Sequence, residues 1–424
     1  MISLADKLLA CGNSRPATPT FFVGLSKTGV HVSASGVASD SAGGYAIVGG
    51  IGDTPSAVFV AVFDDSGALR WQRKLSFTSA LSSPKVCFDA SGNLYVAAGD
   101  NETYKSAYLI KYNSAGVLQW QRKLSLASYN VQGISYWNSI KVSNEGAIYW
   151  LSHVIDATTY PVVAKYDSSG ALAWQRKITN GSAANTACSL DTDPSGSVLV
   201  RYGFGPTSNN ESAVMKLNNA GAYSAVGKLA NCPWNSARSM TCDSAGNVYL
   251  SAPDLATNTP RIIKLNSSLV FQSAKTVDDT VGNFNYGMAL IGDAPVAIGD
   301  GSTFSYARFS AALALNALRK ITSSAGAFTP LCLANDPKWL IAGGQGRISQ
   351  ASYNDAALIK LDPGDDLGAY PPMAVTDYAD TASAGNTPGA GSDNSTSSAS
   401  ALTEAAGGLT DAAGTLTITR YAKD

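Results

Sequence analysis

Charged side chains are scarce in this chain. Asp, Glu, Lys and Arg make up 14% of its 424 residues, and the formal net charge is −1. A protein that binds nucleic acid needs a clustered positive surface, so this balance excludes nucleic acid as a main partner. Gly, Ser, Ala, Thr and Asn stand where Lys and Glu are usual. This composition favours an all-β protein with many turns.

Long apolar runs and closely paired cysteines are also missing. No stretch reaches the roughly eighteen apolar residues of a membrane-spanning helix, so we expect no membrane insertion. The six cysteines contain no Cys-x-x-Cys motif, which argues against zinc and thioredoxin-type sites. We expect buried free thiols, and a Cys232–Cys242 disulfide is the open alternative. Leu8 to Cys11 imitates a lipoprotein cleavage box, but the segment before it is short and carries Asp6, so we expect neither lipidation nor a conventional signal peptide.

What the chain does contain is an internal repeat. Trp-Gln-Arg-Lys-Leu stands at 71–75 and again at 120–124, and Trp174 begins a third copy that ends in Ile178. The tryptophans are 49 and 54 residues apart. A period of this length exceeds any single helix or strand and is typical of stacked or ring-shaped repeat proteins. The Arg-Lys pairs within these copies are the recurrent basic feature, and a repeated strand position explains them.

Two turn motifs alternate along the chain, and each occurs seven times when degenerate copies are counted. The first is apolar-Asp/Asn-x-x-Gly, as at Phe63 to Gly67. The second is Asp-x-x-Gly-x-apolar-Tyr, as at Asp89 to Tyr95. Asp or Asn accepts a hydrogen bond from its own turn and Gly takes the left-handed position, so both motifs close hairpins.

Strand-like runs lie between these turns, and Val58 to Phe63 is apolar throughout, as a strand buried on both faces would be. Each period then holds four short antiparallel strands. The sequence predicts an all-β fold, a seven-bladed β-propeller over residues 21–370. An open β-solenoid is the alternative, but its coils are shorter, commonly about twenty to thirty residues. Residues 21–32 look like half a repeat and are expected to complete the last blade, which removes the free edges.

The repeated tryptophans are expected to begin the outer strands of three consecutive blades. Burial of each ring contributes at most several kcal/mol. In the later repeats Ala225, Gln272 and Ala317 are expected at this position. The first three blades should therefore be the better packed ones.

The two ends lie outside the predicted ring. Residues 1–20 are expected to form an N-terminal arm. Residues 371–406 are rich in Ser, Thr, Ala and Gly, a composition that predicts a flexible linker. Residues 407–424 are predicted to hold a docking strand, because 414–421 alternate polar and apolar residues. A lone strand needs a sheet to join, either a blade edge or another subunit.

The repeats resemble known families. Phe63-Asp64-Asp65-Ser66-Gly67-Ala68-Leu69-Arg70-Trp71, with its relatives at 112–120 and 166–174, resembles the repeat of quinoprotein-like propellers. The copies at 89–95 and 243–249 resemble the bacterial β-propeller repeat of secreted and phage-encoded proteins. The resemblance spans 21 to about 365 and implies the fold, which hosts many functions.

The resemblance does not extend to a cofactor. The quinone-dependent dehydrogenases of the wider family use an adjacent Cys-Cys pair and calcium-binding carboxylates, and no two cysteines are adjacent here. We therefore expect no cofactor and no metal. The low charge, the Ser/Gly/Ala/Thr-rich composition and the C-terminal extension resemble the style of bacteriophage tail or virion surface proteins.

Residues for catalysis are few. His31 and His153 are the only histidines, and no Gly-x-Ser-x-Gly motif marks a nucleophile, so a Ser-His-Asp triad is not expected. The recurrent aspartates are used in turns. A carboxylate pair for glycoside hydrolysis stays an open alternative, because such a pair assembles only in space. We expect no catalytic residues and no enzyme activity.

Aromatic residues beside amides mark the segments that join one predicted blade to the next. Flat apolar rings and amides suit the recognition of sugars or proteins, although packing between blades is the open alternative. The predicted ligand face consists of Tyr129, Tyr136, Trp137, Trp234, Phe284 and Tyr286.

The sequence thus predicts a non-enzymatic binding module of a bacteriophage virion, on the tail or capsid surface. It would be assembled in the host cytoplasm and bind other virion proteins through the N-terminal arm or residues 414–421, and a host-surface glycan or receptor through the aromatic face. The alternatives are a secreted, extracellular carbohydrate-binding propeller of a bacterium and a propeller-fold polysaccharide-degrading enzyme.

Overall fold

The structure is a computed structural model of the chain. It describes residues 21–362, apart from gaps between strands, and seven short strands beyond residue 362. The gaps are 28, 41, 53–56, 77–80, 101–105, 126–129, 133–138, 156–158, 180–186, 204–211, 230–231, 233–238, 254–259, 278–282, 301–303, 324–327 and 347–353. The predicted arm 1–20 lies outside the described residues. No described residue is helical, and hence none of them belongs to a helix that could cross a membrane.

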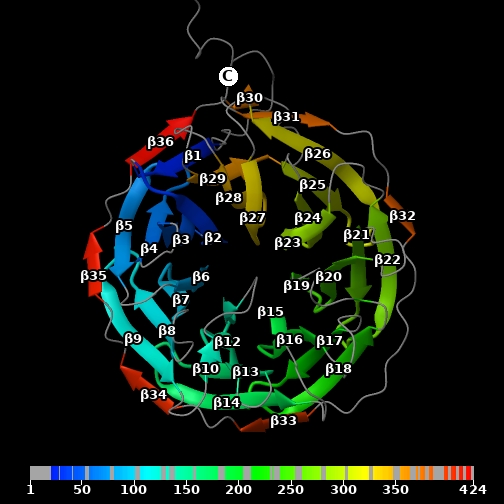
Figure 1. Cartoon of the computed structure of the whole chain (residues 1–424). Helices are drawn as coiled ribbons and strands as arrows, with labels where there is room; N and C mark the ends of the chain where they lie inside the picture. The colour runs from blue at the N-terminus through cyan, green and yellow to red at the C-terminus, as the bar shows by residue number, and fades with distance from the viewer. Residues whose placement is uncertain are drawn as a thin grey trace, which may run out of the picture.

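Seven antiparallel sheets stand around a common axis (Figure 1). The predicted seven-bladed β-propeller is therefore confirmed. Each sheet is a blade, numbered here in chain order from the first complete one, and its strands follow one another from the axis outward. The outer edge of each blade thus belongs to its last strand.

The strands of the blades, from inside to outside, are as follows. Blade 1 holds β2 (Val32–Ser39), β3 (Tyr45–Ile51), β4 (Ala57–Phe63) and β5 (Leu69–Ser76), and blade 2 holds β6 (Leu81–Phe88), β7 (Leu94–Asp100), β8 (Ser106–Tyr112) and β9 (Leu118–Ser125). Blade 3 holds β10 (Asn130–Gln132) and β11 (Ile140–Val142) on its inner side, then β12 (Ile148–Ile155), β13 (Thr159–Tyr166) and β14 (Leu172–Thr179). Blade 4 holds β15 (Ala187–Thr192), β16 (Val198–Gly203), β17 (Ser212–Leu217) and β18 (Tyr223–Leu229).

Blade 5 holds β19 (Met240–Cys242), β20 (Val248–Pro253), β21 (Pro260–Leu265) and β22 (Phe271–Val277). Blade 6 holds β23 (Asn283–Ile291), β24 (Ala294–Asp300), β25 (Phe304–Phe309) and β26 (Leu315–Ser323). Blade 7 holds β27 (Phe328–Ala334), β28 (Leu340–Gly346), β29 (Asp355–Leu361) and, from the start of the chain, β1 (Phe21–Ser26).

The ring closes as the sequence predicted. β1 pairs antiparallel with β29, with Val23 opposite Leu358. The first strand of the chain thus becomes the fourth strand of the last blade. His31, between β1 and β2, accepts a hydrogen bond at Nδ1 from the backbone N–H of Asn354 at 2.9 Å, so this histidine supports the closure.

The hydrophobic core is divided among the junctions between blades. Seven clusters of buried side chains fill them, and each cluster combines residues of two adjacent blades. The apolar run of β4 is buried along its whole length, because one face packs on blade 2 and the other on blade 7. Every blade is therefore stabilised by its two neighbours, as in other repeat proteins.

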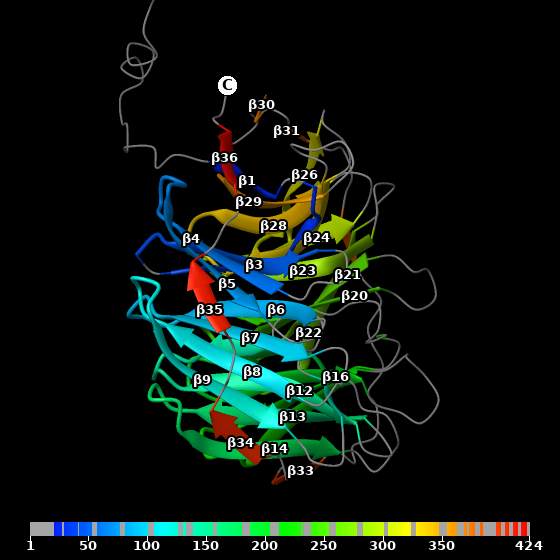
Figure 2. The same ribbon diagram turned by 60° about the vertical axis from the view of Figure 1, so that its left-hand side comes forward.

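The predicted turns form on one side of the ring, which we call the turn face (left in Figure 2). In the turn after β4, the Asp64 carboxylate accepts the backbone N–H groups of Ser66 and Ala68, both at 2.9 Å. Asp89, Asn113, Asp167, Asp193, Asn218, Asp243 and Asn266 each make the same two contacts. The side chains that the sequence assigned to turns are therefore used there.

Each repeated tryptophan lies over a turn of the next blade. A Cβ added to Gly116 would lie 2.5 Å from the Trp71 ring, and one added to Gly170 would lie 2.8 Å from the Trp120 ring. The Trp120 indole donates to the Ser168 carbonyl of the same turn at 3.3 Å. Glycine is therefore needed at these turns both for its positive φ and for the ring above it.

The turns of blades 5 and 6 make this contact with the preceding blade through different residues. Their turns carry Leu269 and Leu313 at φ 63° and 62° in place of glycine, and both leucines are buried. The facing position in blade 4 is Ala225, which packs against the Leu269 cluster. In blade 5 the facing position is Ser273, not the expected Gln272, because Lys264 pairs with Ser273 as Lys111 pairs with Trp120. A small residue and a leucine thus replace a tryptophan and a glycine.

A fifth strand covers the outer edge of six blades. These strands are β31 (Met373–Asp377), β32 (Ala382–Ala384), β33 (Thr396–Ala399), β34 (Thr403–Ala406), β35 (Thr410–Ala413) and β36 (Thr417–Tyr421), and we call them together the belt. They pair with blades 6, 5, 3, 2, 1 and 7 in that order. The belt therefore runs around the ring against the order of the blades (Figures 1 and 2). A further two-residue strand, β30 (Ala369–Tyr370), pairs with β31.

The belt differs from the flexible linker expected over 371–406. Four of its strands fall in that range and pair with blade edges. The physical reason is that an outer strand already offers a row of N–H and C=O groups, so a polar segment can join it through its backbone without an apolar core of its own. In the predicted docking segment, β36 pairs with β1, which is the blade-edge alternative.

The described cysteines are unpaired. Cys87, Cys232, Cys242 and Cys332 are free thiols, so the alternative of a Cys232–Cys242 disulfide is not what the chain forms.

Candidate functional site

Most of the predicted aromatic face lies outside the described residues. This holds for Tyr129, Tyr136, Trp137 and Trp234. Phe284 and Tyr286 lie on β23, the inner strand of blade 6, where the pairing with β24 shifts register between Asn283 and Gly287. The aromatic face therefore stays a prediction.

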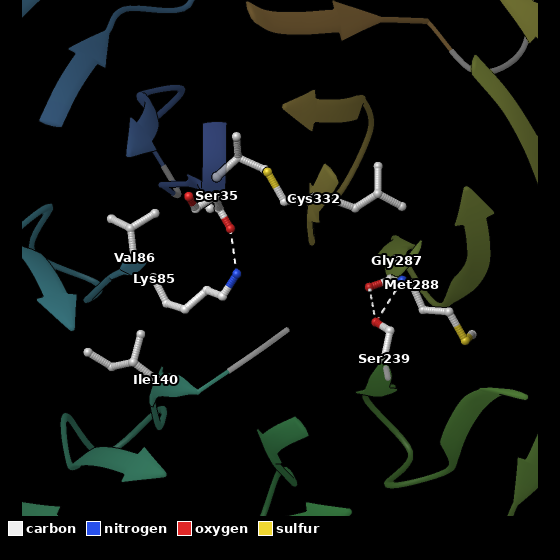
Figure 3. A pocket seen from close by; sticks show the side chains of 11 residues that line it. Ser35, Lys85, Val86, Ile140, Ser239, Gly287, Met288 and Cys332 are labelled. Carbon is white, nitrogen blue, oxygen red and sulfur yellow. Dashed lines mark hydrogen bonds between the residues drawn. The ribbon is translucent and has the colours of Figure 1, made fainter. Parts of the chain in front are cut away.

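A small cavity lies on the axis of the ring (Figure 3). Residues on the inner strands of five blades, and Ser239 directly before the inner strand of blade 5, line it, and its polar residues are Ser35, Lys85, Ser239 and Cys332. The Lys85 ammonium donates to the Ser35 carbonyl at 2.5 Å, and the Ser239 hydroxyl accepts the Met288 N–H at 2.7 Å. The volume is about 20 Å³, which is room for about one water molecule. The cavity is too small for an organic ligand.

Burial determines the protonation of the two reactive groups in this cavity. It lowers the pKa of Lys85 to about 8, and the nearby Cys332 only partly opposes this shift. Burial likewise raises the pKa of the Cys332 thiol to about 12, against the effect of Lys85. At neutral pH the lysine is mostly charged and the cysteine is protonated, so neither is in its nucleophilic form.

A larger depression lies on the turn face of blades 2 and 3. It consists of two adjoining clefts of about 390 and 340 Å³, which share Glu145, Gly146 and Ser168. We call them together the turn-face cleft. The first cleft is lined by Lys111 and by the turns that begin at Asp89 and Ser143, and the second by Lys165, Asp167 and their neighbours. Volumes of this size are typical of ligand sites.

The two lysines of this cleft are held in fixed positions. Lys111 lies over the Tyr95 ring, 5.3 Å from its centroid, and donates to the Ser168 carbonyl at 2.9 Å. Lys165 lies over the Tyr149 ring at 5.6 Å and donates to the Asn219 carbonyl at 3.0 Å. Each lysine thus links its own blade to a turn of the next, and the cation–π contact limits its motion.

Glu145 is held in the same network. The Asn219 side-chain amide donates to its carboxylate at 2.9 Å. Tyr149, beneath this network, donates its hydroxyl to the Gly196 carbonyl at 2.8 Å, and burial together with the charge of Glu145 raises its pKa to about 12. Tyr149 is therefore a neutral hydrogen-bond donor at physiological pH.

The other carboxylates of the cleft are bound to their own turns. Asp167 accepts hydrogen bonds from the Ser169 hydroxyl and from two backbone N–H groups, which lower its pKa. Asp89 accepts from Ser91, Asn93 and Tyr95. The lowered pKa makes Asp167 a poor general acid. Glu145 is the carboxylate of the cleft outside these turn interactions.

These lysines were not predicted as site residues, although the sequence contains a signal for them. A lysine stands two residues before the turn Asp or Asn in five repeats, at Lys111, Lys165, Lys216, Lys264 and Lys360. Four of them donate to a turn of the following blade. The Arg-Lys pairs are therefore not the only recurrent basic feature. Within the described ranges, no group of His, Cys, Asp and Glu is arranged to hold a metal ion.

Known proteins give little further guidance. No family model matches the chain, and no curated protein does, so the likeness to quinoprotein-like repeats stays a resemblance. The solved structures that are similar in shape include the following three. A protein of unknown function from Dyadobacter fermentans has 10% identity and TM-score 0.43, covering 79% of this chain and 96% of that one. The WD40 domain of SCAP from fission yeast has 12% identity and TM-score 0.39, covering 80% and 98%.

The third is apo prolyl oligopeptidase B from Galerina marginata, with 9% identity and TM-score 0.45. The match covers 87% of this chain and 52% of that enzyme, so the chain spans about half its length. These similarities are too weak to carry a function, and it is the topology of the chain itself that identifies it as a seven-bladed β-propeller.

Proposed function

We propose that the protein is a non-enzymatic binding module of a bacteriophage virion, exposed on the tail or capsid, and that its turn-face cleft holds a hydroxyl-rich ligand such as a host-surface glycan. The observation that supports this proposal is that basic and acidic side chains occur together in the cleft in fixed positions. Lys111 and Lys165 stand beside Glu145 and Asp167, so donors and acceptors alternate without a net positive charge.

This balance supports a sugar over an anionic ligand. A phosphate site would need an excess of Lys, Arg or free N–H groups, whereas sugar hydroxyls both donate and accept hydrogen bonds. Backbone groups of the turns hold Lys111, Lys165 and Asp167, and the Asn219 side-chain amide holds Glu145, so little side-chain entropy is lost on binding. The binding of Asp167 and Asp89 to their turns supports the non-enzymatic part of the proposal.

The test is a glycan array probed with the full chain, followed by calorimetry on the best ligand. Glu145→Ala and Lys165→Met should each weaken binding by at least about tenfold, since a hydrogen bond to a charged group contributes about 1.5–3 kcal/mol. Ser268→Ala is the matched control, because Ser268 is an exposed turn residue of blade 5.

A Trp137→Ala variant separates the two faces. If it abolishes binding while the two cleft variants bind normally, the ligand lies on the predicted aromatic face and the cleft assignment is refuted. Release of shortened glycan by the wild-type chain would instead establish the enzyme alternative.

The virion assignment is supported by the low-charge, Ser/Gly/Ala/Thr-rich composition and by the belt, since a ring covered along its edges suits a protein exposed on a particle. The proposed partners are other virion proteins, reached through the N-terminal arm or the region of 414–421. Mass spectrometry of purified particles from a producing host should find the chain in them. Its recovery only from the particle-free medium would favour the secreted alternative.

A further inference from the structure

The belt contains a second repeat, with a period of seven residues. Thr396, Thr403, Thr410 and Thr417 begin its four copies. The first three read Thr-Ser-Ser-Ala-Ser-Ala-Leu, Thr-Glu-Ala-Ala-Gly-Gly-Leu and Thr-Asp-Ala-Ala-Gly-Thr-Leu, and the fourth begins Thr-Ile-Thr-Arg. Each copy has Thr in the first place, and the three complete ones have Ala in the fourth and Leu in the seventh. We call this seven-residue unit the belt heptad.

Every belt heptad meets its blade in the same register. The leading threonine is opposite a hydroxyl residue near the end of the outer strand, and the fourth residue is opposite the position three before it. The leading pairs are Thr396 with Thr179, Thr403 with Ser125, Thr410 with Ser76 and Thr417 with Ser26. One heptad therefore corresponds to one blade.

The ring offers a repeated acceptor sequence at these places. It is Arg-Lys-Leu-Ser at 73–76 and 122–125 and Arg-Lys-Ile-Thr at 176–179. Each repeat of about fifty residues in the ring is thus paired with one repeat of seven residues in the belt. Seven extended residues reach about 23–25 Å, so the step of the heptad is set by the distance from one blade edge to the next.

The same step continues beyond the clear heptads. On blade 6, Ala374 is opposite Thr322, the equivalent of Ser76, and Thr381 follows seven residues later, directly before β32 on blade 5. From Thr381 to Thr396, the first residue of the strand on blade 3, there are fifteen residues, which is two steps and one extra residue. Position along the belt is therefore matched to position around the ring.

We propose that the blade edges are a docking surface specific for the belt heptad, and that a second copy of this chain can supply the belt, so that copies exchange belts. The contacts in an exchanged pair would be the same backbone ladders as within one chain, so exchange adds no new unfavourable contact. Each belt strand is short, with three to five residues paired to its blade, so one belt can replace another blade by blade. Ring closure by β1 and β29 does not involve the belt, so the acceptor survives the exchange.

We identify the occupant as a second copy because the blade edges select the seven-residue spacing of the strands as well as their sequence. A partner must present strands at intervals of seven residues against the order of the blades, and this chain carries that arrangement. An unrelated extended peptide could pair with one edge but not with several in phase, and it would lack the gain from linked sites.

The experiment uses the full chain with a protease site inserted within 363–368 and cleaved after folding. Cleaved protein labelled with ¹⁵N is mixed with unlabelled cleaved protein below the temperature of ring unfolding and followed by native mass spectrometry. We expect complexes of labelled ring with unlabelled belt, rising to the proportion set by mixing. A matched variant carries one Gly inserted between Leu402 and Thr403, which keeps every strand sequence but shifts the phase of β34 to β36 against β33, and its belt should be retained and exchanged less well than the wild-type belt.

Three results would overturn the proposal. The belt could separate from the wild-type ring on cleavage, which would mean that only the covalent tether holds it there. It could stay without ever exchanging, which would exclude a second copy as donor. The Gly-inserted belt could be retained and exchanged as well as the wild type, which would show that the edges do not read the seven-residue step.

Discussion

Replacing Gly170 by alanine tests how firmly Trp120 is seated between blades 2 and 3. Gly170 has φ +81°, and an added Cβ would lie 2.8 Å from the indole ring. Gly146, in the other turn of blade 3, has nearly the same φ of +79° but nothing within 4 Å of an added Cβ. The two positions therefore share the backbone cost of alanine and differ in the contact with tryptophan.

The magnitudes follow from these two contributions. An alanine in the left-handed region costs about 1–2 kcal/mol, and the stiffer unfolded chain returns about 0.4–1 kcal/mol. Gly146→Ala should therefore lower the free energy of unfolding by about 1 kcal/mol. Gly170→Ala adds the cost of overpacking, about 1–3 kcal/mol, so its total should be about 2–4 kcal/mol.

The assay is unfolding by urea at fixed pH, followed by circular dichroism so that the tryptophan itself is not the probe. A third protein carries Trp120→Ala, with and without Gly170→Ala. Removal of the ring should reduce the effect of Gly170→Ala to that of Gly146→Ala, which is a coupling that a double-mutant cycle measures directly. Equal losses for the two glycine variants in the wild-type background would refute the reasoning, because Trp120 would then move aside without cost.

Two further predictions concern the inter-blade contacts and the axial cavity. Ala225→Trp alone should destabilise the ring by a clash, and Leu269→Gly alone should destabilise it by a cavity. In urea unfolding, the double variant should be more stable than the sum of the two single changes predicts, by at least about 1 kcal/mol. Strictly additive changes would contradict the replacement of the tryptophan–glycine pair by an alanine–leucine pair. The pKa of Lys85 is about 8 in the folded chain, and its ordinary value is 10.5. Between these pH values the unfolded chain therefore binds more protons than the folded chain. The contribution of Lys85 to the free energy of unfolding should rise with pH through that window, by at most about 3 kcal/mol. The difference in unfolding free energy between wild type and Lys85→Met reports this rise, and a difference that stays constant from pH 7.5 to 10.5 would show that the Lys85 pKa is not lowered.

The ring was predictable because its sequence signals are local. The Trp-Gln-Arg-Lys phrase marks outer strands, Asp64 and its equivalents mark turns, and 21–32 marks the closing strand. The one-residue displacement from Gln272 to Ser273 shows the limit of this approach. Without a tryptophan to fix the alignment, only the observed pairing with Lys264 sets the register.

The belt was not predictable from composition. Residues 396–421 cannot bury enough apolar surface to order themselves, and this is what composition measures. Their order depends on edges that other parts of the chain provide, such as β9 for Thr403 and β5 for Thr410. The spacing of the threonines was nevertheless present in the sequence, and a search for short periods would have found it. For the turn-face cleft, Lys111 and Lys165 recur at a fixed place before the turn, but their approach to Glu145 depends on how neighbouring blades stack.

The reverse course of the belt has a consequence for damage to the backbone. Blades 3, 2, 1 and 7 are joined twice, once by the main chain that leads from blade to blade and once by β33 to β36 on their outer edges. A protease that cuts one loop between two of these blades removes only the first connection. The second connection should keep this part of the molecule folded after a single cut, and the fragments should separate only in denaturant.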